Sequence, residues 1–295
     1  MNDSGVARVL DAGAFQLTLD HPLVMGIVNV TPDSFSDGGR FSGADAAYAH
    51  ATQLLAEGAD IIDIGGESTR PGATAVTERE ELARVMPLLE RLAQCGKPVS
   101  VDTRKPAVMR AAIAAGAAMI NDVDALRAPG ALEALAATNA AVCLMHMQGE
   151  PATMQSAPQY ADVVGEVVAY LRARIAACRA AGIARTRLVA DPGFGFGKTL
   201  GHNLALLRGL DRFSELGVPV LAGLSRKGTL GALTGRPVDQ RLPASIAAAL
   251  AAVMRGAAIV RVHDVAATVD ALKIWQAAGL LPASGGAGHS GQQCT

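Results

Sequence analysis

The chain has 295 residues, 50% of them hydrophobic and only 3% aromatic, and its 26 basic and 27 acidic residues give a net charge of −1. This balance argues against a nucleic-acid partner, because such partners need a basic surface and aromatic stacking platforms. The sequence also lacks a basic, apolar leader and any apolar window of about 18 residues. We therefore expect a cytoplasmic protein with no membrane contact.

Apolar strand-like runs alternate with helix-like stretches from the first quarter of the chain onward. The runs predict strands at residues 23–28, 61–64, 99–101, 118–120, 141–145, 188–190, 218–222 and 259–262. The stretches predict helices at residues 44–57, 77–94, 106–115, 129–137, 160–181, 203–210, 244–255 and 265–278. Repeated βα units with right-handed crossovers favour an α/β protein with a closed (β/α)8 TIM barrel over an open doubly wound sheet.

The predicted barrel fills a single domain over residues 23–281. Residues 1–22 are expected to be an N-terminal extension that forms a strand pair or plug at the barrel floor. Residues 282–295 are rich in Gly, Ser and Gln and are expected to be disordered. The four cysteines have no metal-like spacing, and we expect reduced thiols at Cys95, Cys143, Cys178 and Cys294.

Polar residues gather directly after the predicted strands, on the face where barrels of this type hold their chemistry. Any one of them has a structural alternative: Asp102 or Asp122 could cap a helix, and His146 could be a core histidine. Convergence from every strand is harder to explain in that way. The residues concerned are Asn29, the segment GGESTRPG, Asp102, Asn121, Asp122, His146, Asp191, Ser225, Lys227, Arg261 and His263.

Two of the loops that follow predicted strands contain several glycines. The segment GIVNVTPDSFSDGG, residues 26–39, turns from a buried strand into a long polar loop, which is typical of a functional βα loop. The segment DPGFGFGKT resembles a phosphate-binding glycine loop, but Pro192 stands where that motif requires glycine. We therefore predict that its glycines allow a close backbone approach to a flat ligand.

Eight segments in this order resemble those of the dihydropteroate synthases: GIVNVTPDSFSDGG, GADIIDIGGESTRPG, VSVDTRKP, INDV, LMHMQG, DPGFGFGK, GLSRKG and RVHDV. The resemblance implies condensation of a pterin pyrophosphate with p-aminobenzoate in folate biosynthesis. It also implies a Mg²⁺ requirement, a homodimer, and inhibition by sulfonamides. The sequence departs from the usual pattern at Gly228, where many relatives carry Ser beside the p-aminobenzoate carboxylate.

The resemblance also assigns residues to three subsites. For the pterin it implies Asp102, Asn121, Asp191, Lys227, Arg261 and Met145. For the pyrophosphate it implies Asn29, Thr69, Arg70, Arg261 and His263, with Asn29 as the Mg²⁺ ligand and Asp33 or Asp37 as further candidates. For p-aminobenzoate it implies Phe35, Thr69, Arg70, Pro71, Phe196, Ser225 and Lys227.

Asn29, Asp102, Lys227, Arg261 and His263 are therefore the predicted catalytic set. The motifs contain no Ser–His–Asp or Cys–His set, which favours an SN1-like reaction through a pterin methylene cation. The alternatives are a pterin-binding methyltransferase that passes a methyl group to a corrinoid, and a catalytically silent paralogue that only binds pterin.

Overall fold

The structure is a computed structural model that describes residues 9–30, 40–68, 75–150 and 153–280. Its centre is a closed barrel in which every hydrogen-bonded pair of neighbouring strands is parallel. The (β/α)8 barrel predicted from the sequence is thereby confirmed. The barrel strands are β3 (Leu23–Asn29), β4 (Ile61–Gly65), β5 (Val99–Asp102), β6 (Met119–Asp122), β7 (Ala141–Met145), β8 (Leu188–Asp191), β9 (Val220–Ala222) and β10 (Ala257–Val262).

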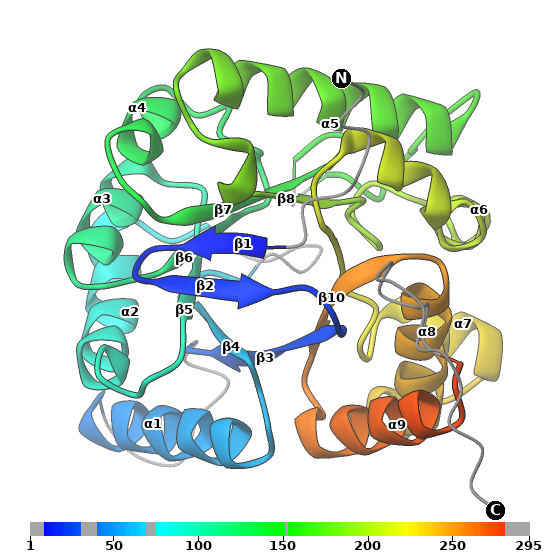
Figure 1. Cartoon of the computed structure of the whole chain (residues 1–295), viewed down its shortest axis with the longest axis horizontal. Helices are drawn as coiled ribbons and strands as arrows, with labels where there is room; N and C mark the ends of the chain where they lie inside the picture. Colours follow the sequence, from blue (N-terminus) through cyan, green and yellow to red (C-terminus); the bar gives the residue numbers. More distant parts are fainter. Residues whose placement is uncertain (1–8, 31–39, 69–74, 151–152, 281–295) are drawn as a thin grey trace, which may run out of the picture.

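The helices form an outer ring around these strands (Figure 1). They are α1 (Arg40–Ala56), α2 (Glu78–Leu92), α3 (Pro106–Ala114), α4 (Ala131–Ala136), α5 (Val163–Ala180), α6 (Leu200–Arg208), α7 (Gly228–Thr234), α8 (Leu242–Met254) and α9 (Val265–Ala277). Short 3₁₀ helices lie at η2 (Arg185–Arg187), η3 (Leu210–Leu216) and η4 (Val238–Gln240). Helix α6 begins before the predicted residue 203 because Thr199 and His202 form a capping box.

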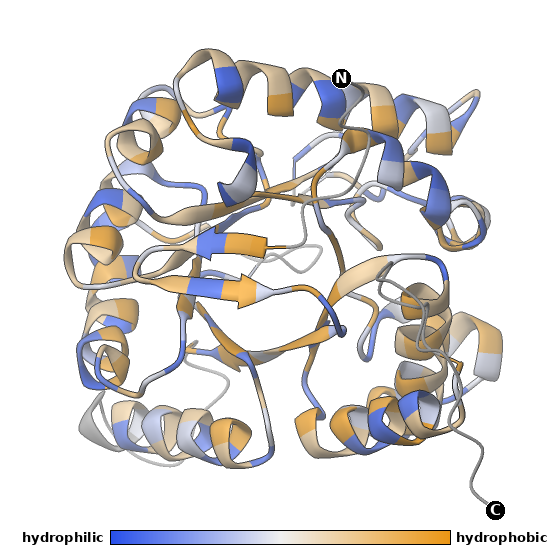
Figure 2. Cartoon of the chain, in the orientation of Figure 1, coloured by the Kyte–Doolittle hydropathy of each residue, from blue (hydrophilic) through white to orange (hydrophobic). Residues whose placement is uncertain are grey.

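Two apolar layers hold the barrel together. The outer layer packs the strands against the helices, and hydrophobic residues, coloured orange in Figure 2, occur along both kinds of element. The inner layer fills the barrel itself with side chains that are at most 3% exposed, among them Met25, Ile61, Met119, Cys143 and Ile259. The barrel is therefore a packed core with no open pore, and its chemistry is confined to its ends.

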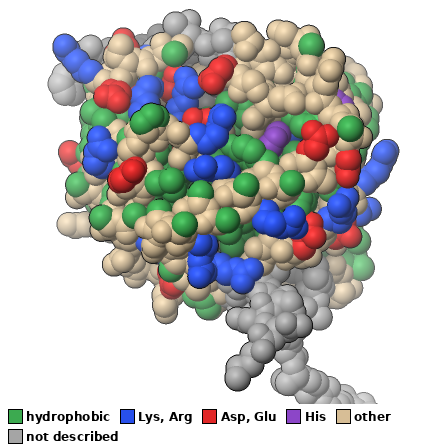
Figure 3. Space-filling view, turned by 90° about the horizontal axis from the view of Figure 1, so that it is seen from above, with side chains coloured by type: hydrophobic (Ala, Val, Ile, Leu, Met, Phe, Trp, Pro, Cys, Tyr) green, Lys and Arg blue, Asp and Glu red, His purple; other side chains and the backbone are tan. Residues whose placement is uncertain are grey.

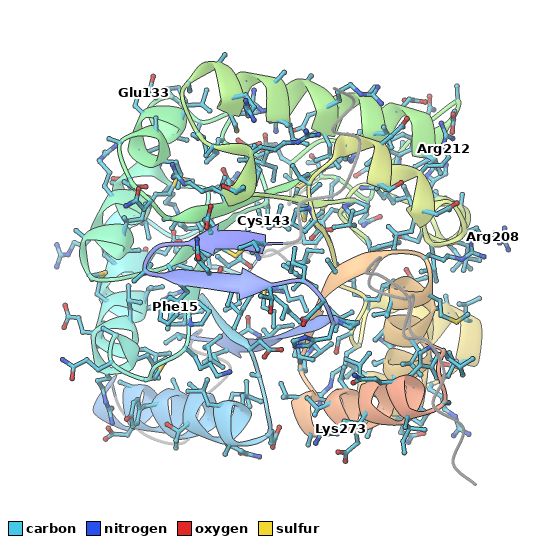
Figure 4. The ribbon with its side chains drawn as sticks, viewed as in Figure 1. Phe15, Glu133, Cys143, Arg208, Arg212 and Lys273 are labelled. Carbon is cyan, nitrogen blue, oxygen red and sulfur yellow. The ribbon has the colours of Figure 1, made fainter. Side chains whose placement is uncertain are left out.

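An antiparallel hairpin of β1 (Val9–Ala12) and β2 (Phe15–Thr18) lies across one end of the barrel (Figure 1). Leu10 and Ala12 are almost completely buried in the inner apolar layer. Phe15 packs against the same layer, to which the buried Cys143 belongs, and both are labelled in Figure 4. The hairpin thus covers the floor of the barrel.

The carboxyl ends of the parallel strands meet at the opposite end, the mouth. Among the described residues, no helix combines the length and the apolar character that crossing a bilayer requires. Figure 3 shows one face of the molecule, on which basic side chains are interrupted by apolar and acidic ones.

Candidate active site

Four residues at the mouth occupy one continuous row across neighbouring strands. Asn29 is the register partner of Gly65, Gly65 pairs with Asp102, and Asp102 pairs with Asn121. A Cβ atom added at Gly65 would lie 3.6 Å from Asn29 Oδ1 and 3.8 Å from Asp102 Cβ. The missing side chain at Gly65 therefore leaves room for a methyl group between the amide oxygen of Asn29 and the Cβ atom of Asp102. Four strand ends, far apart in sequence, contribute to one surface.

Arg261 on β10 joins this row through two carboxylates. Its Nε atom donates to Asp63 Oδ2 at 2.6 Å, and its NH2 group donates to Asp102 Oδ2 at 3.0 Å. Asn121 Nδ2 donates to the same Asp63 oxygen at 3.1 Å. Asp63 is fully buried, and its Oδ1 atom has no hydrogen-bond partner among the described residues. Asp63 thus fixes both Arg261 and Asn121.

Burial and charge act against each other in this network. Burial raises the pKa of Asp102 to about 7; Arg261 opposes this shift, and nearby Asp63 adds to it. Burial alone would lower the pKa of Arg261, but Asp63 and Asp102 together raise it above the ordinary value. The guanidinium is therefore a permanent cation, whereas the Asp102 carboxyl titrates near neutral pH.

Asp191 and Lys227 lie on the other side of the mouth. Asp191 Oδ1 accepts the Gly193 backbone N–H at 2.7 Å, and burial raises the pKa of Asp191 although Lys227 opposes it. Lys227 Nζ donates to the Phe194 carbonyl and lies 4.5 Å from the centroid of the Phe196 ring. Burial lowers the pKa of Lys227 to about 8, against the attraction of Asp191.

Apolar side chains and a hydroxyl complete the described part of the mouth. Val123, Met145, Met147 and Met154 form a small buried cluster, against which Phe196 packs. Ser225 Oγ lies 3.1 Å from His263 Nδ1 and accepts the His263 backbone N–H at 3.2 Å. The site therefore combines polar groups suited to a heterocycle edge with an apolar wall and cations suited to an anionic group.

Comparison with known proteins places this arrangement in a family. The family model for pterin binding enzyme matches residues 25–263. A dihydropteroate synthase of Neisseria meningitidis serogroup B is 58% identical over 280 residues, which cover 92% of this chain and 98% of that protein. That of Escherichia coli K12 is 52% identical over 269 residues, covering 91% and 95% respectively.

The chain belongs to the dihydropteroate synthase family of pterin-binding enzymes.

Solved structures of dihydropteroate synthases share the whole fold. The Xanthomonas albilineans enzyme with 4-aminobenzoic acid has a TM-score of 0.88 and 59% identity, covering 94% of this chain and all of that chain. A Yersinia pestis dihydropteroate synthase in complex with a sulfonamide drug has a TM-score of 0.87 and 51% identity, covering 92% and 99%. The resemblance read from the eight motifs is confirmed.

The glycine-rich loop after β8 of this dihydropteroate synthase fold packs closely against the segment after β7, a contact that the sequence did not indicate. Gly193 and Gly197 have φ angles of +71° and +58°. A Cβ atom would lie 2.0 Å from the His146 carbonyl oxygen at Gly193, and 2.3 Å from the Gln148 carbonyl oxygen at Gly197. These two glycines therefore permit close approach to the backbone after β7, rather than an approach to a ligand alone.

Lys198, which the sequence did not single out, fastens the same loop. Its Nζ atom is buried and contacts the carbonyl oxygens of Gly193 and Phe196 at 2.9 Å each, together with His146 Nδ1 at 3.1 Å. Burial and the Lys198 charge lower the pKa of His146 to about 3, so the imidazole is neutral. His146 thus follows the alternative of a core histidine and supports the loop.

We expect Gly193→Ala to destabilise the protein by several kcal/mol, because an L-residue at a left-handed φ costs about 1–3 kcal/mol and the methyl group adds a clash with the His146 carbonyl oxygen. Denaturant unfolding measures this effect. Gly96→Ala is the matched control, since Gly96 also has a positive φ of +74° but open space around it. Equal losses in both variants would contradict the packing explanation.

Several predicted site residues lie outside the described part of the chain: Asp33, Phe35 and Asp37 after β3, and Thr69, Arg70 and Pro71 after β4. Their assignments stay predictions from the family resemblance. Asp63 has none of the roles predicted from the sequence. A carboxylate within the apolar strand IIDIG was the available signal, because such a group requires a buried partner.

Proposed function

We propose that this chain condenses 6-hydroxymethyl-7,8-dihydropterin pyrophosphate with p-aminobenzoate, releasing pyrophosphate and 7,8-dihydropteroate. Its membership of a transferase family rests on relatives of 52–58% identity over more than nine tenths of the chain. The observation that carries the proposal is the convergence of Asp102, Asn121 and Asp191 with two cations, Lys227 and Arg261, at one barrel mouth. A structure of the Xanthomonas albilineans relative contains 7,8-dihydropteroate.

The pterin fits the buried half of this set. Its amide-like edge carries N–H donors that need carboxylate or amide oxygens, and a carbonyl that needs a cation. We assign the edge to Asp102, Asn121 and Asp191, and the carbonyl to Lys227. The Arg261 guanidinium is held in place by Asp63 and Asp102, and we assign it to the ring face. Met145 is assigned to the apolar wall.

The departing pyrophosphate needs cations and hydrogen-bond donors, because negative charge builds on it as the bond breaks. We assign Asn29, Thr69, Arg70, Arg261 and His263 to this group. Of these, Arg261 and His263 are already oriented in the described structure, by the contacts to Asp63, Asp102 and Ser225. Thr69 and Arg70 would join them from the β4–α2 loop.

A magnesium ion fits the residues available for it. Among the described residues no group of three or more His, Cys, Asp and Glu side chains is placed to hold a metal. Mg²⁺ commonly keeps several waters and takes one or two protein oxygens plus ligand phosphates. Asn29, next to the space left by Gly65, would supply one such oxygen, and Asp33 is the further candidate. Bound Mg²⁺ would neutralise charge on the pyrophosphate.

The second substrate is a planar arylamine with a carboxylate. We assign its ring to Phe35, Pro71 and Phe196, and its polar groups to Thr69, Arg70, Ser225 and Lys227. Phe196 and Lys227 are already in contact with each other in the described structure, with 4.5 Å between Nζ and the ring centroid. A sulfonamide that mimics p-aminobenzoate would occupy the same place, as the sulfonamide complex of the Yersinia pestis relative suggests for this chain.

The bond change proceeds in an SN1-like order in this proposal. Pyrophosphate leaves first, and the amine nitrogen of p-aminobenzoate attacks the resonance-stabilised methylene carbon and then loses a proton. The Ser225–His263 contact is a Ser–His pair that the motifs did not reveal. We assign it to holding substrate, because Ser225 Oγ also accepts the His263 backbone N–H and is thereby kept in place.

Measurement of pyrophosphate release with and without p-aminobenzoate tests the function. We expect release that depends on p-aminobenzoate and yields 7,8-dihydropteroate in equal amount. Loss of a methyl group from methyltetrahydrofolate to a corrinoid, with no pyrophosphate, would instead establish the methyltransferase alternative. Binding of the pterin substrate without turnover would establish the silent paralogue.

Arg70→Ala should affect the p-aminobenzoate and pterin subsites to different extents. We expect it to weaken p-aminobenzoate capture and turnover more than it weakens pterin binding to the free enzyme, because Arg70 is assigned to p-aminobenzoate as well as to the pyrophosphate. Steady-state kinetics and calorimetry with the pterin substrate measure the two effects. An equal loss of pterin affinity would contradict this division of roles.

A homodimer is also part of the proposal. Leu233 on α7, Val238 in η4 and Leu242 on α8 are 53%, 54% and 40% exposed. They are close together in sequence, on consecutive helices, and we assign these three side chains to an interface with a second copy of the chain. Sedimentation analysis should show a dimer, and Val238→Glu should weaken it. A monomer at micromolar concentration would contradict the assignment. The cytoplasmic location stays a prediction.

A further inference from the structure

Arg226 has an unusual backbone conformation between two residues of the proposed site. Its φ angle is +57°, in the left-handed region that non-glycine residues rarely adopt. Ser225, on one side, contacts His263 at the end of β10. Lys227, on the other, contacts Phe194 and Phe196 in the loop after β8. The chain therefore changes direction at Arg226, and the side chains on either side of it contact different parts of the barrel mouth.

All three polar parts of Arg226 are held by other elements. The guanidinium forms a two-point ion pair with Asp264, in which Nε donates to Oδ2 at 3.0 Å and NH2 donates to Oδ1. The backbone N–H donates to Ser245 Oγ at 3.0 Å, and the carbonyl accepts from Arg241 NH1 at 3.1 Å. Ser245 Oγ in turn donates to the Arg241 carbonyl at 2.8 Å.

These contacts join the ends of β9 and β10 by two consecutive pairs. Ser225 meets His263, and the next residues along each segment, Arg226 and Asp264, form the ion pair. The backbone contacts come from α8 and from the segment just before it, and Ser245 is only 4% exposed. An unfavourable backbone conformation that is fixed on several sides is typical of functional segments.

We propose that Arg226 is a positioning residue, whose left-handed backbone, held by Asp264, Ser245 and Arg241, sets the direction in which Ser225 and Lys227 meet the substrates. This inference rests on the proposed function of those two residues. It assigns no chemistry to the Arg226 side chain, which is partly exposed. Released from these contacts, the segment would return to an ordinary negative φ and move Lys227 away from Phe194 and Phe196.

The decisive comparison is between Arg226→Ala and Arg226→Gly. Both variants remove the ion pair, but only glycine tolerates the left-handed conformation without cost. We expect kcat/KM to fall at least tenfold in Arg226→Ala and to recover partly in Arg226→Gly. A side chain that contacted substrate would give equal losses in both, because both variants lack it. Equal losses would therefore overturn the proposal, as would wild-type kinetics in Arg226→Ala.

Two further variants test the contacts themselves. Asp264→Asn removes the charge that pairs with Arg226 and should also lower kcat/KM. In the double variant with Arg226→Ala it should cause little further loss, because both changes disrupt the same ion pair. Arg172→Ala is the matched control, since Arg172 forms an exposed ion pair with Glu215 at 3.3 Å on α5 and η3, and wild-type kinetics are expected. Fully additive losses in the double variant would count against the proposal.

A second readout separates this inference from the proposed function. Calorimetric binding of 7,8-dihydropteroate should be several-fold weaker in Arg226→Ala than in the wild-type protein, and intermediate in Arg226→Gly, with cooperative thermal unfolding retained in both variants. If the wild-type protein turns over and binds but the variants match it, only the positioning role is wrong. If the wild-type protein neither turns over nor binds dihydropteroate, the proposed function itself fails.

Discussion

Arg261→Met is expected to lower the free energy of unfolding by roughly 3–5 kcal/mol, the usual cost of removing one partner from a buried ion pair. Asp63 is fully buried, and its Oδ2 atom accepts from Arg261 at 2.6 Å and from Asn121 at 3.1 Å. Without the guanidinium, the Asp63 carboxylate has no cation to offset its desolvation. Turnover should be lost as well, because Arg261 is assigned to both the pterin face and the pyrophosphate.

Urea unfolding and steady-state kinetics measure the two losses independently. The double variant Asp63→Asn with Arg261→Met is the informative control, because it removes the uncompensated charge. It should regain much of the lost stability but none of the activity. A loss of less than about 1 kcal/mol in the single variant would mean that the pair contributes no more than an exposed salt bridge does.

Lys227→Ala is expected to lower pterin pyrophosphate affinity or turnover at least tenfold, which corresponds to about 1.4 kcal/mol. Lys227 contacts Phe194 and Phe196, and it interacts electrostatically with Asp191. Its removal therefore takes away the cation and loosens the glycine-rich loop. Kinetics with each substrate varied in turn measure the effect, and Lys273→Ala, a change on α9 outside the site, should behave as the wild-type enzyme. Kinetic constants close to those of the wild-type enzyme would show that Lys227 is not part of the site.

Asp102 and Lys227 together predict that turnover depends on pH. Burial raises the pKa of Asp102 to about 7 and lowers that of Lys227 to about 8. Asp102 therefore gains a proton below about pH 7 and stops accepting from the pterin, whereas Lys227 loses its proton above about pH 8. We expect a bell-shaped profile of kcat/KM between these values. Lys227→Arg should move the alkaline fall in kcat/KM to higher pH, since arginine stays protonated. If this fall stays at the same pH, it is caused by a group other than Lys227.

The sequence predicted the barrel well because its strands are short apolar runs followed by polar residues, and this alternation depends on local patterning. Helix α7 was not predicted, since a seven-residue helix with two glycines has little periodic signal. The central role of Asp63 and the support from Lys198 depend on partners 198 and 52 residues away along the chain. No local pattern reveals such contacts.

Backbone conformation was equally beyond the reach of the sequence. Gly193 and Gly197 could be recognised as permissive, but the carbonyl oxygens that require them belong to another loop. Arg226 gave no signal, because arginine is not a residue typical of a left-handed φ. Local preference was outweighed there by contacts from α8 and from Asp264.

The packed barrel and the hairpin that covers its floor leave only the mouth accessible to substrates. Side chains such as Met25 and Ile61 fill the barrel above Leu10 and Ala12, so both substrates would enter, and both products would leave, through the mouth. At a site with one entrance, the substrate assigned to the deeper position would have to bind first. The pterin, assigned to the strand ends, would be trapped beneath p-aminobenzoate until the two are joined, and a p-aminobenzoate molecule that arrived early would block the entrance.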